Sequence, residues 1–232
     1  MRLRVGTSGY SYVPWKGRFY PSDLPTKRML AYYAEHFATV ECNSTFRGLP
    51  SAKSVATWHD TVGPDFRFAI KCQQAITHVR RLRDCADPLA ALLAATAGLG
   101  NRRGPLLAQL PPFMRADTAL LDDFLAAVPA GTRIALEFRH ESWFTDAAWA
   151  VLAKHGAALC LAESDDLATP RVATTGWGYL RLRRTDYPPA EIAQWAAFIA
   201  AQRWDEAFAY FKHEDTATGP RFAKQLNEAW AS

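Results

Sequence analysis

Charged side chains occupy alternate positions in several short apolar runs of this sequence, an arrangement that can hold ionised groups inside a protein. In the run 133–139, Glu137 and Arg139 alternate with apolar residues, and Arg181 and Arg183 do so in a later run. Side chains two positions apart in a β-strand lie on the same face of the sheet. We therefore expect these four charges to share an inner face and to form a site for an anion.

Two further runs add Glu41, Asn43 and Lys71 to the same expected face, and Gln109 ends a fourth run. The set then holds four cations and two carboxylates, which leaves two excess positive charges. Arginine binds phosphate or carboxylate through paired hydrogen bonds that strengthen where water is excluded. The alternative interpretation is that the Glu–Arg pairs only neutralise one another, as buried charges generally must.

Proton transfer and covalent catalysis are both within the chemistry of these residues. Glu137 or Glu41 can act as a general base, and His140 or His213 can carry protons near neutral pH. Lys71 can contact a phosphate, act as an electrophile, or form a Schiff base if burial lowers its pKa. A structural salt bridge to either glutamate explains Lys71 equally well.

Aromatic residues follow two of the runs. Tyr10 and Trp15 lie in the segment after the first run, and Trp143 follows the run that holds Glu137. They can stack on a base or sugar above the site, or they can anchor their own loops in the core. Surface arginines such as Arg80 have no recognised nucleic-acid-binding motif beside them.

We expect no metal and no cofactor. The sequence contains no His-x-His or Asp-x-Asp pair, and the cations near the candidate carboxylates would repel a divalent ion. A set made of Glu41, Glu137, Glu163 and His213 is the alternative. The turn at residues 6–9 also lacks the full glycine fingerprint of a dinucleotide site.

The elements that must position these residues alternate regularly along the chain. Segments with helical spacing separate the runs, except at 164–176, which contains Pro170 and no apolar helical face. Eight strand–crossover units of about 29 residues predict a closed TIM-barrel-like (β/α)8 barrel, in one domain over residues 1–232, with an irregular crossover between strands six and seven. A doubly wound open sheet is the alternative. The expected strands are residues 3–6, 39–43, 66–71, 105–109, 133–139, 158–163, 178–183 and 207–211.

Composition restricts the class of protein. The 232 residues are 49% hydrophobic and 22% charged, which excludes collagen-like and disordered chains. A net charge of +4 does not by itself indicate a nucleic-acid or membrane partner. The four cysteines form no Cys-x-x-Cys pair, and no apolar run approaches the roughly 18 residues of a membrane span, so we expect a cytoplasmic protein.

Taken together, these segments resemble the family called domain of unknown function 72, the YecE-like proteins. The resemblance implies a TIM-barrel-like fold and no established activity. Many members carry a histidine where this chain has Arg183, and two asparagines at positions 212–213. The segments that carry the resemblance are VGTSGY at 5–10, WKGRFYP at 15–21, TVECNSTF at 39–46 with LP at 49–50, FRFAIK at 66–71, ITH at 76–78, QLPP at 109–112, EFRH at 137–140 with SW at 142–143, and FKHED at 211–215.

We expect a hydrolase, lyase or isomerase that acts on a small anionic, possibly phosphorylated, substrate at the C-terminal mouth of the barrel. A nucleic-acid-binding or processing protein and a non-catalytic interaction scaffold are the alternatives.

A more specific expectation places the anion beside strands seven and eight. There Arg181 or Arg183 and Lys212 would meet the backbone N–H groups at 216–219, where the last helix begins. The alternative is that Thr218 only caps this helix, while the acidic residues at 214–215 pair with arginines.

Overall fold

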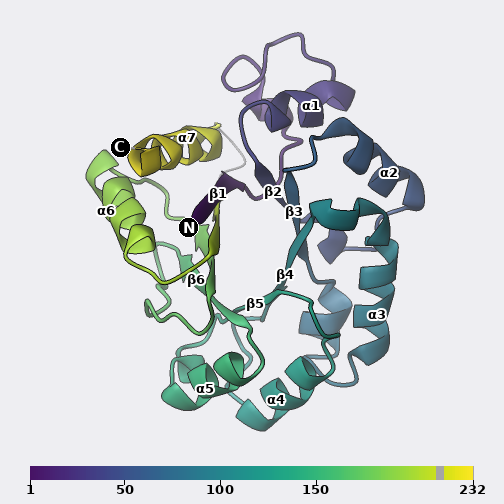
Figure 1. Cartoon of the computed structure of the whole chain (residues 1–232), viewed down its shortest axis with the longest axis vertical. Helices are drawn as coiled ribbons and strands as arrows, with labels where there is room; N and C mark the ends of the chain where they lie inside the picture. The colour runs from purple at the N-terminus through teal and green to yellow at the C-terminus, as the bar shows by residue number, and fades with distance from the viewer. Residues whose placement is uncertain (213–216, 232) are drawn as a thin grey trace.

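Eight parallel strands enclose a barrel in the computed structural model of this chain, which describes residues 1–212 and 217–231 (Figure 1). Their order in the sheet is β1-β8-β7-β6-β5-β4-β3-β2, so strands adjacent in sequence are adjacent in space. The predicted (β/α)8 fold is therefore confirmed. The strands are β1 (Arg2–Thr7), β2 (Thr39–Cys42), β3 (Arg67–Lys71), β4 (Arg103–Gln109), β5 (Ile134–Glu137), β6 (Ala158–Glu163), β7 (Trp177–Leu182) and β8 (Glu206–Phe211).

Seven α-helices of the described residues form an outer ring around the strands (Figure 1). Ser51, Asp117 and Thr145 begin three of them, and each side chain accepts a hydrogen bond from a backbone N–H of the first turn. The helices are α1 (Met29–Ala34), α2 (Ala52–Thr61), α3 (Ala86–Ala95), α4 (Thr118–Ala126), α5 (Asp146–Lys154), α6 (Pro189–Ala200) and α7 (Thr218–Ala231).

The connection between β6 and β7 contains no helix, as the sequence predicts. This segment supplies hydrogen-bond partners to β6 instead. The Thr174 hydroxyl accepts from the N–H of Leu159 at 2.9 Å, and the N–H of Thr169 donates to the carbonyl of Ala162 at 2.9 Å. β6 pairs with β5 at only two positions, and the irregular segment provides hydrogen-bond partners for backbone groups of β6 beyond that pairing.

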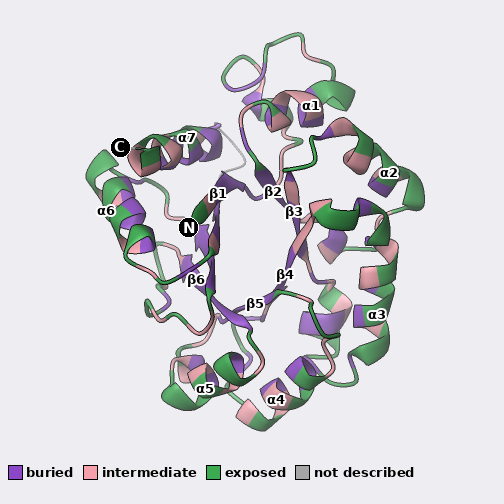
Figure 2. Ribbon diagram, in the orientation of Figure 1, coloured by how far each residue is buried: buried purple, intermediate pink, exposed green. Residues whose placement is uncertain are grey.

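Apolar residues pack on both sides of the strand ring, which is buried except at some strand ends (Figure 2). The larger core lies between the strands and the helices and includes Leu180 and Leu182. The smaller core lies inside the barrel, where alanines of β3, β5 and β6 face aromatic side chains of β7 and β8, among them Tyr179. This complementarity of small and large residues fills the barrel interior and leaves its polar groups at the strand ends.

The barrel closes between β1 and β2 without a continuous ladder. A Cβ at Gly6 would lie 2.1 Å from the carbonyl oxygen of Thr39, so only glycine permits the close approach of these strands. The buried Tyr33 hydroxyl fills the remaining gap. It accepts from the N–H of Thr7 at 2.8 Å and donates to the carbonyl of Thr39 at 3.0 Å.

We predict that Tyr33→Phe destabilises the protein by about 1–3 kcal/mol, because it leaves the buried N–H of Thr7 and the carbonyl of Thr39 unpaired. Urea unfolding followed by circular dichroism measures the loss. Tyr32→Phe is the matched control, since Tyr32 is half-buried on the same helix and its hydroxyl makes no hydrogen bond within the described part of the chain. Equal stability of the two variants would contradict the closure role of Tyr33.

Candidate functional site

The guanidinium of Arg181 lies inside the barrel between two carboxylates. Its Nη1 lies 2.5 Å from Oε2 of Glu137 on β5, and its Nη2 donates to Oε1 of Glu41 on β2 at 2.8 Å. The side chain of Arg181 is 2% exposed, and those of both glutamates are completely buried. Burial alone would lower the pKa of Arg181, but the two carboxylates raise it well above its usual value.

Glu137 is shared by three arginines. Besides Arg181, Nε of Arg139 forms an ion pair with Oε1 of Glu137 at 2.5 Å, and Nη2 of Arg183 lies 3.8 Å from the same oxygen. Burial opposes ionisation of Glu137, but these guanidiniums outweigh it and lower its pKa to about 2. Glu137 is therefore a fixed negative charge that orients arginines, and it is poorly suited to the role of general base that the sequence suggested.

Glu41 connects this group to the closure of the barrel. Its Oε1 accepts a hydrogen bond from the hydroxyl of Ser8, which follows β1, and its Oε2 accepts one from Tyr179 at 2.7 Å. The backbone of Ser8 also pairs with that of Glu41 as an isolated parallel bridge. The same carboxylate thus binds Arg181 and joins the first two strands.

Lys71 ends β3 and faces the same end of the barrel. Its ammonium donates to Oε1 of Gln109 at 2.9 Å and lies 4.4 Å from the ring centroid of Phe46. Burial and the nearby charge of Arg181 lower the pKa of Lys71 to about 8. Gln109 also accepts from Arg181 at 3.2 Å, so one amide oxygen links Lys71 to the arginine network.

Two predicted aromatic contacts lie in the core instead of over the site. Trp143 is completely buried, stacks on Phe138 at 4.6 Å and donates from Nε1 to the carbonyl of Met114 at 2.8 Å. Trp15 is 1% exposed and packs against Tyr20. Neither indole can stack on a ligand from these positions, because the loops that carry them use the rings as anchors.

Tyr10 also lies away from the arginines. It is half-buried, packs 6.1 Å from the ring of Tyr33, and lines a cavity with residues of α1 and α2. Burial raises its pKa to about 12. The alternative of a loop anchor therefore describes Tyr10 better than ligand stacking does.

His140 has a local structural role at the end of β5. Its Nδ1 accepts from the N–H of Ser142 at 3.1 Å and lies 2.9 Å from the Ser142 hydroxyl, so the ring caps the start of the turn at Glu141–Trp143.

Asn43 follows β2, and its buried Oδ1 has no hydrogen-bond partner within residues 1–212 and 217–231. Asn43 thus holds a buried polar atom whose partner the described residues do not supply.

The predicted anion corner beside β7 and β8 changes in composition. Two carboxylates bind Arg181, so Arg183 is the arginine that remains for an anion at this corner. Lys212 is half-buried, and its charge contributes to the lowered pKa of Lys71, so the two amines are neighbours. His213 and the residues to 216 lie outside the described residues.

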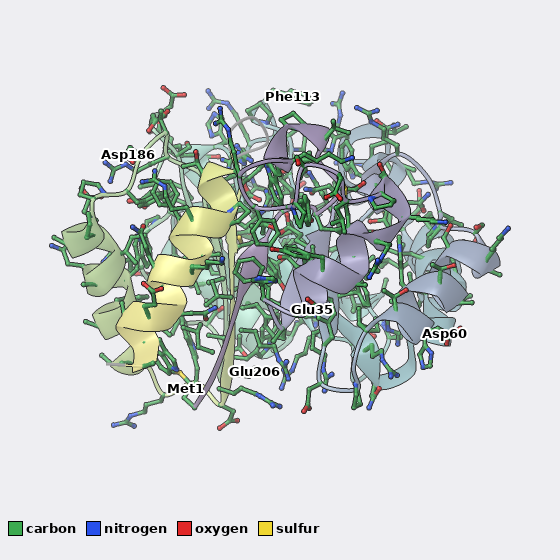
Figure 3. All side chains as sticks on the ribbon, turned by 90° about the horizontal axis from the view of Figure 1, so that it is seen from above. Met1, Glu35, Asp60, Phe113, Asp186 and Glu206 are labelled. Atoms are coloured by element: carbon green, nitrogen blue, oxygen red, sulfur yellow. The ribbon has the colours of Figure 1, made fainter. Side chains whose placement is uncertain are left out.

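The charged network lies at the end of the barrel where the strands terminate. In Figure 3, the labelled residues Phe113 and Asp186 lie on the mouth side, and Met1 and Glu206 lie on the opposite side. In the described part of the chain, no group of three or more His, Cys, Asp or Glu residues could hold a metal ion. Both carboxylates of the network, Glu41 and Glu137, are paired with arginines.

Sequence reasoning missed two members of the site. Ser8 lies two residues beyond Gly6 and four beyond Arg4, so the alternation of β1 could have identified it as an inward residue. Phe46 had no such signal, because it reaches Lys71 from a short 3-10 turn (Ser44–Phe46) after β2.

Fold and site together define a TIM-barrel-like protein with a buried arginine–glutamate network at its mouth. Residues 4–232 match the family described as "Protein of unknown function DUF72", and the chain belongs to that family. No helix among the described residues is long and apolar enough to cross a membrane.

Relatives and solved structures agree with this assignment. The UPF0759 protein YecE of Escherichia coli K12 is 34% identical over 116 residues, which are 50% of this chain and 43% of that protein. The UPF0759 protein YunF of Bacillus subtilis is 27% identical over 138 residues, 54% of this chain and 48% of that one. The matched parts thus span less than half of these relatives.

Two solved DUF72 family proteins share the fold. One from Thermotoga maritima has a TM-score of 0.91 and 24% identity, with both chains covered completely. One from Enterococcus faecalis has a TM-score of 0.81 and 18% identity, and the match covers 99% of this chain and 96% of that one.

We predict that Arg181→Met lowers the free energy of unfolding by about 3–5 kcal/mol, because it leaves Glu41 buried without a cation. The double variant Glu41→Gln with Arg181→Met removes that unpaired charge and should recover part of the loss. Urea unfolding of both variants gives the comparison. A loss of less than about 1 kcal/mol, typical of surface pairs, would show that Arg181 is not the centre of the network.

The lowered pKa of Glu137 predicts a pH dependence of stability. Its contribution is fully present above the unfolded-state value of 4.5 and is lost as the pH falls through the folded-state value of about 2. Arg139→Gln should raise the pKa of Glu137, which the 13Cδ resonance of this residue reports in an NMR titration. Arg115→Gln, at an exposed arginine after β4, is the control and should leave the titration unchanged. A Glu137 pKa near 4.5 in the unmodified protein would refute the pairing.

Proposed function

We propose that the barrel mouth binds a small anionic, phosphorylated substrate and that the protein is a hydrolase, lyase or isomerase acting on it. The observation that carries the proposal is the charge balance among the described residues of the mouth. Lys71, Arg139, Arg181 and Arg183 surround Glu41 and Glu137, so four cations meet two carboxylates. A bound anion would offset the remaining positive charge.

Arg183 and Arg139 are the side chains best placed for the ligand. They are 16% and 20% exposed, whereas Arg181 is 2% exposed and held by both glutamates. Burial and the adjacent guanidiniums lower the pKa of Arg183, and its buried Nε has no hydrogen-bond partner within the described residues. An anion at this point would stabilise the charged form of Arg183 and provide an acceptor for its donors.

Lys71 is the group suited to proton transfer. With a pKa of about 8 it is protonated near neutral pH and can donate a proton to a developing oxyanion. The resulting neutral amine can then accept a proton from the next intermediate or from water. Glu137 does not share this role, since three guanidiniums hold it ionised.

A single-stranded nucleic acid is the second candidate ligand, and one observation favours it. The guanidinium of Arg81 lies 5.2 Å from the ring centroid of Phe113, which is exposed on the mouth side (Figure 3). Such an aromatic–arginine pair can stack on bases. Binding of an oligonucleotide that weakens with salt and is reduced by Phe113→Ala would support this candidate over a small metabolite.

We predict that phosphorylated metabolites, whose phosphate monoester has a second pKa of about 6 and is mostly dianionic at pH 7, bind more tightly at pH 7 than at pH 9. Lys71 loses its charge through its pKa of about 8, so the attraction for an anion falls above that pH. Arg183→Gln should weaken binding about tenfold at both pH values, as expected for the loss of a charge-assisted hydrogen bond. Isothermal titration calorimetry at constant ionic strength measures both effects.

Lys71→Met should abolish the difference between the two pH values, whereas Lys27→Met, which removes an exposed charge from the first loop, should preserve it. Catalysis is tested separately by NMR detection of product in mixtures of phosphorylated metabolites. Phosphate affinity that is unchanged in both Arg183→Gln and Arg139→Gln would exclude the mouth as the anion site.

A further inference from the structure

A second arginine-lined cavity lies at the opposite end of the barrel from the mouth. It has a volume of about 260 Å³ and is lined by Arg67, Arg103 and Arg133, at or beside the starts of three strands, together with Glu206. Figure 3 places Glu206 on the side of Met1, away from Phe113. Phe208, an aromatic residue of the inner core, also lines it.

We propose that this cavity is a binding site for a phosphate monoester, separate from the mouth. Arg67, Arg103 and Arg133 would contact the phosphate group. The volume is several times the roughly 30 Å³ that one water occupies in the liquid, so the cavity admits a phosphate with a small substituent.

The charge balance of the cavity supports an anionic ligand. Glu206 is already shared, since Nε of Arg4 lies 2.5 Å from Oε1 and Nη1 of Arg133 donates to Oε2 at 2.7 Å. In the described part of the chain, no carboxylate lies within 4.0 Å of the guanidinium of Arg67 or Arg103. Three guanidiniums and one carboxylate therefore line the cavity, which leaves two positive charges.

Arg67 and Arg103 are held in place by backbone groups. Nη1 of Arg67 donates to the carbonyls of Pro64 and Phe66 at 2.8 and 3.0 Å, and Nη1 of Arg103 donates to the carbonyl of Leu93 at 3.0 Å. Burial and the charge of Arg4 lower the pKa of Arg67. These contacts orient both guanidiniums without neutralising them, and an anion would supply the missing charge.

A β-bulge shapes the wall of the cavity. Phe68 pairs with Arg103 and Ile70 with Leu106, so between these pairs one residue of β3 opposes two of β4. The extra residue falls at Gly104 and Pro105, which line the cavity. Bulges disrupt the ladder locally and recur beside functional sites, and proline at this point has no N–H to leave unpaired.

Binding is tested in the Arg183→Gln background, where the mouth is already weakened, so that this site and the mouth can fail independently. We expect glycerol 3-phosphate to shift the 1H–15N resonances of Gly100, Gly104 and Gly131, which line the cavity, with saturable one-to-one binding. Adding Arg103→Gln should weaken this binding about tenfold. Arg28→Gln, at an exposed arginine of the first loop, is the matched control and should have no effect.

Inorganic phosphate and sodium chloride at equal ionic strength distinguish the sources of the effect. Tighter binding of glycerol 3-phosphate than of inorganic phosphate supports a monoester, and equal affinity shows that free phosphate is the ligand and overturns that part of the proposal. Shifts reproduced by chloride, or an unchanged affinity in Arg103→Gln, would show that the arginines serve only the fold. Circular dichroism of each variant confirms that it is folded.

Discussion

The buried guanidinium of Arg181 is the constraint on which the mouth of this barrel depends. Removing an arginine and two carboxylates from water is costly, and the cost is offset only where hydrogen bonds satisfy the charged groups. The two terminal nitrogens of Arg181 meet this condition through Glu41, Glu137, Gln109 and Ser8, whereas its buried Nε has no hydrogen-bond partner among the described residues. The ion pairs therefore do not imply high stability, but they fix the distance between β2, β5 and β7 across the barrel.

That arrangement determines which groups remain for a ligand. Both carboxylates are committed to orienting cations, and Glu41 also joins β1 to β2 through Ser8. The positive charge of Lys71, Arg139 and Arg183 exceeds what the glutamates neutralise. The anion affinity that we propose for the mouth would thus be a consequence of the interaction that holds the strand ends together, with a proton on Lys71 available near neutral pH.

Much of this architecture follows from alternation in the sequence. Leu180 and Leu182 on one side of β7 predicted that Arg181 faces inward, because strand periodicity is local and the barrel allows one inner face. The burial of Trp15 and Trp143 could not be predicted in this way. A loop that stacks its aromatic residues on a ligand and a loop that anchors itself with them can have the same composition. Their positions depend on contacts with Tyr20 and Phe138 that the strand pattern does not encode.

The arginines outside the inner face illustrate a second limit. Arg81 follows β3 and lies near the mouth with Phe113, whereas Arg103 begins β4 and lines the cavity at the opposite end. Both appear as surface charge in the sequence, and only the topology separates them. The bulge at Gly104 also escapes prediction, because it depends on the register between two strands.

Anomalous diffraction from a crystal soaked in selenate tests the role of the mouth most directly. Selenate resembles phosphate in shape and charge, and the anomalous signal of selenium gives its position. The account predicts a selenium peak within hydrogen-bond distance of Arg183 and Arg139, on the side of Lys71, with Arg181 still bound to both glutamates. A mouth without selenate at saturating concentration, or an Arg181 that leaves Glu41 to bind the ion, would contradict it.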